Sequence, residues 1–182
     1  MEITKSLIVK YQKNEEVEKL LSDFKDMVNF CIRKAQEIKT TSIKKLHKAC
    51  YEELKKRYNY NTIFYPMAYR IASQVIRSFK KNGGKFPEEI PEVKKKIVRL
   101  HKLYFKIVED KLIIHIRPNE IVEVKLELSD YHKKELGKGK IGEVIIDESC
   151  VYIPVKYEIN LTESKEAIAI DVNENNIAFV DS

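Results

Sequence analysis

The 182-residue chain carries 34 Lys and Arg residues against 28 Asp and Glu, a net charge of +6, and 43% of its residues are hydrophobic. That content supports a core of one large or two small domains and excludes a wholly disordered chain. No apolar run of 18 residues and no secretory leader are present, so we expect a soluble, cytoplasmic protein without a membrane partner.

The first predicted elements are a strand and two helices. Alternating apolar residues predict a strand over residues 3–11. Asn14, followed by an acidic turn, is expected to cap a long amphipathic helix over 15–38, and a second helix follows over 43–58. The apolar stripe of the long helix either packs on the next two helices or pairs with the same helix of another chain.

A third helix is predicted to begin at Pro66 and to end before Gly83. The exposed face of this helix should carry a narrow basic ridge, because four polar residues, three of them basic, follow one another at spacings of four, three and four residues. One more lysine lies beside them. These candidate nucleic-acid-binding residues are Arg70, Gln74, Arg77, Lys80 and Lys81. Such a ridge suits contact with a sugar-phosphate backbone, and an ordinary solvated helix face is the alternative. Residues 1–82 as a whole hold 18 basic residues against 9 acidic ones, as expected of a polyanion-binding region.

After a linker over residues 83–96, the apolar period changes to two. Strands are predicted near 103–107, 112–116, 122–128, 141–147 and 150–159, with a short helix over 129–136. Pro154 argues that the last of these strands is an edge strand or carries a bulge. Strand, three helices and five or more strands indicate an α+β fold, a small β-barrel with a helical insertion after its first strand.

Residues 167–182 form a separate pattern, in which an apolar strand delivers Asp171, a polar turn follows, and a second apolar strand returns over 177–180. This arrangement resembles the opening hairpin of an RNase H-like nuclease, whose first strand presents an aspartate to Mg²⁺. An aspartate before an Asn-rich turn is also an ordinary turn former. The three cysteines and four histidines have no metal-ligand spacing, so no zinc site is expected.

Three segments in this order resemble the N-terminal half of the transposon-encoded TnpB (OrfB) proteins, in their archaeal form. They are YPMAYRIASQVIRSFKK (65–81), the GKFPEEIPEVKKK linker with the β-rich block after it, and IAIDVNENNIAFVD (168–181), which looks like the first RuvC motif. The resemblance implies a wedge-like barrel over 1–12 and 83–163, a helical recognition insertion over 13–82, and an incomplete RuvC domain over 164–182.

The resemblance further implies the nucleic-acid-binding part of an RNA-guided DNA endonuclease, with structured guide RNA and DNA as partners. Asp171 matches the family's first metal-binding aspartate, whereas its glutamate, last aspartate and four-cysteine zinc element have no counterpart. We therefore expect a truncated protein that binds without cleaving. The alternatives are a helical protein-interaction module and residual Mg²⁺-dependent cleavage by a homodimer formed through the C-terminal hairpin or the long helix.

Overall fold

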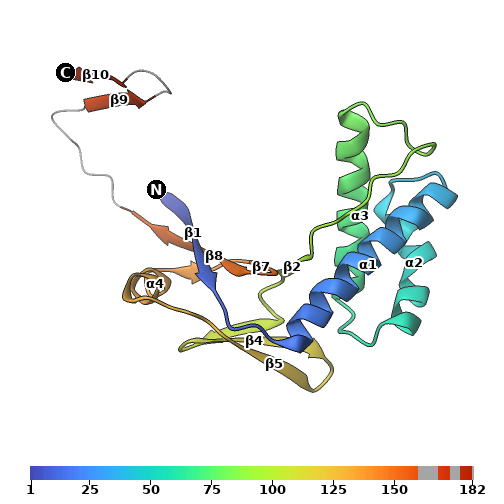
Figure 1. The fold of residues 1–182 in the computed structure, drawn as a ribbon, viewed down its shortest axis with the longest axis horizontal. Helices are drawn as coiled ribbons and strands as arrows, with labels where there is room; N and C mark the ends of the chain where they lie inside the picture. The colour runs from blue at the N-terminus through green and yellow to red at the C-terminus, as the bar shows by residue number, and fades with distance from the viewer. Residues whose placement is uncertain (160–167, 173–176, 182) are drawn as a thin grey trace.

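The computed structural model describes residues 1–159, 168–172 and 177–181 and has an α+β fold with antiparallel sheets (Figure 1). A unit of three helices follows the first strand, as predicted. The elements are β1 (Glu2–Lys10), α1 (Glu15–Glu37), α2 (Ile43–Arg57), α3 (Phe64–Lys81), β2 (Ile97–Leu100), β3 (Phe105–Val108), β4 (Lys111–Arg117), β5 (Glu120–Lys125), α4 (Asp130–Leu136), β6 (Lys140–Ile141), β7 (Val144–Asp147), β8 (Cys150–Glu158), β9 (Ile168–Val172) and β10 (Ile177–Asp181).

Two sheets form the β part of the core. The larger one has the order β1–β8–β7–β2, with β6 also paired to β8, and the smaller one has the order β3–β4–β5. A single bridge between Tyr11 and Leu126 joins them at one corner. Pairing between the strands of residues 1–159 does not close a barrel, so the barrel stays a prediction.

Each sheet turns one face toward the core, because side chains alternate between the two faces of a strand. The inward residues of β1, β8 and β4 belong to one continuous apolar cluster, which also includes the helices. Those that are 0% exposed are Val9, Val151, Ile153, Val155, Leu112 and Ile114. The opposite face of the larger sheet is therefore its solvent face.

The position of β8 corrects one expectation. β8 pairs with β1 along its whole length and with β7 and β6 on its other side, so it is an interior strand and the edge-strand alternative for Pro154 is wrong. The carbonyl of Pro154 accepts a hydrogen bond from the Gly142 amide, 2.8 Å away, in the gap between β6 and β7. The proline nitrogen, which has no hydrogen to donate, faces this same gap, where the ladder is already interrupted.

The helices follow their sequence signals closely. The Asn14 side chain accepts hydrogen bonds from the Glu16 and Val17 amides, as expected of an N-cap. α3 begins at Phe64 and not at Pro66; the proline is tolerated inside the first turn because the amides there have no helical partner in any case. Gly83 follows α3 with a φ of +90°, a conformation that favours glycine.

The apolar stripe of α1 is buried within the chain. α1 lies against α2 and α3 (Figure 1). The stripe members Leu20, Leu21 and Met27 are 0% exposed. This supports the intramolecular alternative for the long helix, since a buried stripe is not available to a second chain. Within the described part of the chain, no helix is long and apolar enough to cross a membrane.

Side-chain amides, those of Asn29 and Asn61 among them, attach the three-helix unit to the rest of the chain. The Asn29 side chain of α1 donates to the Val93 carbonyl and accepts from the Val93 amide, both at 2.9 Å. The Asn61 side chain and amide donate to the carbonyls of His115 and Ile116 of β4, at 2.9 and 2.8 Å. These bonds fix the segments that enter and leave α3 and so determine where that helix lies relative to the sheets.

Replacing Asn29 by leucine is expected to lower the free energy of unfolding by about 2 kcal/mol, because Asn29 is buried and both backbone groups of Val93 lose their partner. Urea denaturation followed by circular dichroism measures this. The control is Asn59→Leu, at an exposed position, which should change the stability by less than about 0.5 kcal/mol. Equal effects of the two substitutions would contradict the anchoring role of Asn29.

Candidate nucleic-acid interface

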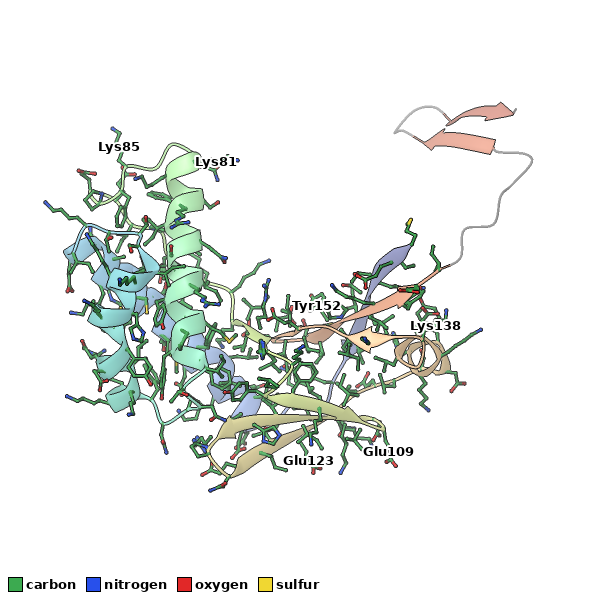
Figure 2. All side chains as sticks on the ribbon, turned by 180° about the vertical axis from the view of Figure 1, so that it is seen from behind. Lys81, Lys85, Glu109, Glu123, Lys138 and Tyr152 are labelled. Atoms are coloured by element: carbon green, nitrogen blue, oxygen red, sulfur yellow. The ribbon has the colours of Figure 1, made fainter. Side chains whose placement is uncertain are left out.

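The basic ridge predicted on α3 is exposed along the helix. Its members Arg70, Gln74, Arg77, Lys80 and Lys81 all lie on the solvent side. The opposite face of the helix is buried, with Ala68, Ala72 and Ile76 each 0% exposed. Figure 2 shows Lys81 at the end of α3 that points away from the sheets, with Lys85 beyond it. The ridge therefore runs from the sheets outward.

The ridge differs from the lysines of α1 in its ion pairs. On α1, Lys19 pairs with Asp23 at 2.6 Å and Lys34 with Glu37 at 2.8 Å. Within the described ranges, the ridge cations have no carboxylate within 4.0 Å. Their charge is thus uncompensated at close range and remains available to an anion.

Packing against α2 and the loop before it holds α3 in a defined orientation. The Tyr69 hydroxyl and His47 Nδ1 lie 2.8 Å apart, and the Ser73 hydroxyl donates to the Thr41 carbonyl at 2.7 Å. Burial raises the pKa of Tyr69, so its hydroxyl keeps its proton at neutral pH. The backbone that carries the ridge therefore loses little conformational entropy on binding.

A groove joins the foot of the ridge to the edge of the larger sheet. Its volume is about 220 Å³, and Arg70 and Gln74 of α3 line it together with Arg99, His101 and Glu143. Arg99 is partly neutralised by Glu143, 3.6 Å away.

The predicted binding residues do not include Arg99 and His101, because the sequence pattern predicts no separate strand over residues 97–100. The alternation of exposed Arg99 with buried Val98 and Leu100 is the signal in the sequence that could have identified it.

Two buried thiols lie at the contact between α1 and α2. Cys31 and Cys50 are each 0% exposed. The neighbouring Cys50 thiol and burial raise the pKa of Cys31, so the Cys31 thiol is not a reactive nucleophile at neutral pH. Among the residues that the structure describes, no group of three or more His, Cys, Asp or Glu side chains could hold a metal ion.

The predicted C-terminal hairpin is confirmed as a pair of strands. β9 and β10 pair antiparallel, and Asp171 lies opposite Ala178 in their register. The side chain of Asp171 lies outside the described part of the structure. Its role as a ligand of Mg²⁺ therefore stays a prediction.

Comparison with known proteins gives a family match and two relatives. Residues 20–116, more than half of the chain, match the model of the family described as Uncharacterized protein MJ0013 family. The chain is 37% identical over 82 residues to TnpB-like protein MJ0751 of Methanocaldococcus jannaschii, a match that covers 42% of this chain and 30% of the relative. It is 43% identical over 77 residues to Uncharacterized protein MJ0752 of the same organism, covering 41% of this chain and 99% of the relative. The chain thus matches under a third of the TnpB-like relative's length.

Proposed function

Since the chain belongs to the MJ0013 family and is similar to a TnpB-like protein, we propose that it is the nucleic-acid-binding part of a TnpB-like, transposon-associated protein of the cytoplasm. The observation that carries this proposal is the exposed ridge of α3, whose cations have no ion-pair partner among residues 1–159. The matched range 20–116 includes this ridge together with Arg99 and His101.

The ridge binds phosphates and not base edges. From Arg70 to Lys81 it extends about 16 Å along the helix, the length of about five phosphates on one strand of a duplex. Arginine forms bidentate hydrogen bonds with phosphate oxygens, and lysine adds point charge. Such contacts hold a helix of RNA or DNA by its backbone, independently of sequence.

Each part of the chain then has its own role in an RNA-guided protein. Residues 13–82 recognise the backbone of guide RNA or target DNA, and the wedge-like domain over 1–12 and 83–163, to which the two sheets belong, holds the guide. Residues 164–182 begin the RuvC-like domain. Asp171 is the first carboxylate of its Mg²⁺ site, which requires further carboxylates for two-metal cleavage.

Binding should depend steeply on salt, because phosphate contacts release condensed counterions. With three or more phosphates neutralised, the logarithm of the association constant for duplex DNA should fall against the logarithm of salt concentration with a slope of about −2.7 or steeper. Fluorescence anisotropy with labelled duplex DNA and structured RNA, titrated over several salt concentrations, measures this slope. Absence of binding to both at low salt would refute the proposed function.

A further inference from the structure

The outer face of the larger sheet carries a row of side chains that crosses four strands and is largely apolar. Ile8, Tyr152, Ile145 and Arg99 are direct neighbours in the registers of β1, β8, β7 and β2. Ile8 is 58% exposed, and Tyr152 and Ile145 are partly exposed, whereas the neighbours of each along its strand are buried. At the usual spacing of strands the row is about 14 Å long. Figure 2 shows Tyr152 on this sheet.

Tyr152 is held in place by the turn between β7 and β8. Its hydroxyl donates to Asp147 Oδ2 at 3.0 Å, and Asp147 Oδ1 accepts from the Ser149 and Cys150 amides at 2.9 and 2.8 Å. Partial burial would raise the pKa of Asp147, but these hydrogen bonds hold that pKa below its usual range, so the carboxylate stays ionised. An aromatic ring oriented in this way is ready to stack on a ligand at little entropic cost.

Basic residues lie at both ends of the row. At one end of the row, Arg99 lines the same groove as Arg70, which lies at the foot of the ridge. Exposed Lys10 lies two residues beyond Ile8 along β1, on the same face of the sheet. A strand of nucleic acid that crosses the row would meet a cation at either end.

Acidic residues near the row make the sheet face unfavourable for phosphates, unlike the ridge. Asp147 and Glu143 lie on the sheet side, where they repel phosphates but accept hydrogen bonds from hydroxyl groups. The ridge thus suits phosphates, whereas the sheet face suits bases and ribose, whose 2′-hydroxyl is a donor that DNA lacks.

We propose that the row Ile8–Tyr152–Ile145 is a stacking surface for the unpaired nucleotides of an RNA strand, and that the backbone of the adjoining nucleotides follows the ridge of α3. This inference rests on the proposed function and extends it by naming single-stranded RNA as the ligand of this face. Bases stack on exposed aromatic rings of a sheet in other modes of RNA recognition, with the phosphates held by flanking cations.

The test uses a short uridine oligonucleotide, its thymidine DNA counterpart and a ribose-phosphate strand of equal length without bases. Tyr152→Ala should weaken uridine binding about tenfold, leave the base-free strand unchanged, and be rescued by Tyr152→Phe, which keeps the ring. The chain has no tryptophan, so Tyr152→Trp introduces a single indole whose emission the uridine strand should quench. Tyr131→Ala, which removes a tyrosine 50% exposed on α4, is the matched control and should bind as the unaltered protein does.

Two results would overturn the inference while leaving the proposed function intact. One is equal affinity of the unaltered protein for the uridine strand and the base-free strand, and the other is equal affinity for the uridine and thymidine strands. If the indole emission changes with protein concentration in the absence of RNA, this face is an interface between copies of the chain and the inference is wrong. Absence of binding to both duplex DNA and structured RNA, by contrast, refutes the proposed function itself.

Discussion

Replacing Arg70, Arg77 and Lys81 together by alanine is expected to weaken the binding of duplex DNA and structured RNA by about 100-fold at ~0.1 M salt. Each lost phosphate contact removes close to one released counterion, so the slope of the salt dependence should become shallower by about 3 units. Fluorescence anisotropy at several salt concentrations gives both quantities. The three side chains are exposed, so the variant should keep the stability of the unaltered protein.

The control for net charge is a single variant with three substitutions on α2: Lys44→Ala, Lys48→Ala and Lys55→Ala. These lysines are exposed, lie on one face of their helix, and have no carboxylate within 4.0 Å in the described ranges. The substitution removes the same three charges from a different surface, and we expect it to change affinity by less than about threefold. If both variants lose affinity equally, binding follows overall charge and the ridge has no special role.

Phe64→Ala is expected to lower the free energy of unfolding by about 3–5 kcal/mol, the range for removal of a buried aromatic ring. Phe64 is 1% exposed at the start of α3, and its ring packs edge-on against Phe24 of α1 at 6.4 Å and Tyr60 at 5.9 Å between centroids. Because a domain of this kind is stable by only about 5–15 kcal/mol, the loss is a large share of the total. Urea denaturation measures it.

The control is Leu103→Ala. The Leu103 side chain is 73% exposed, so its removal should change the free energy of unfolding by less than about 0.5 kcal/mol. Phe64→Leu keeps much of the buried apolar surface and should cost less than Phe64→Ala. If Phe64→Ala leaves the unfolding midpoint unchanged, the packing of α3 on α1 does not stabilise the chain and the fixed orientation of the ridge loses its basis.

Local patterns in the sequence are enough to predict the helices and the faces that they expose. Asn14 is identifiable as a cap, and the spacing from Arg70 to Lys81 correctly predicts an exposed ridge, because helical geometry makes residues three and four apart neighbours whatever surrounds them. The hairpin around Asp171 is predictable for a similar reason, since its two strands are adjacent in the chain.

Tertiary structure alone decided which distant segments meet. Pro154 argues for an edge strand or a bulge, yet β8 lies inside its sheet and the edge-strand alternative is wrong. The pairing of β8 with β1 joins residues as far apart as Glu2 and Glu158 and depends on the shared burial of their inner faces. The same pairing sets Ile8 beside Tyr152, and the packing of α3 brings Arg70 to the groove that Arg99 lines. The residues next to a position in sequence reveal the local periodicity, and so the type of element. They do not reveal its partners across a sheet, since the register is selected by the packing of the whole core.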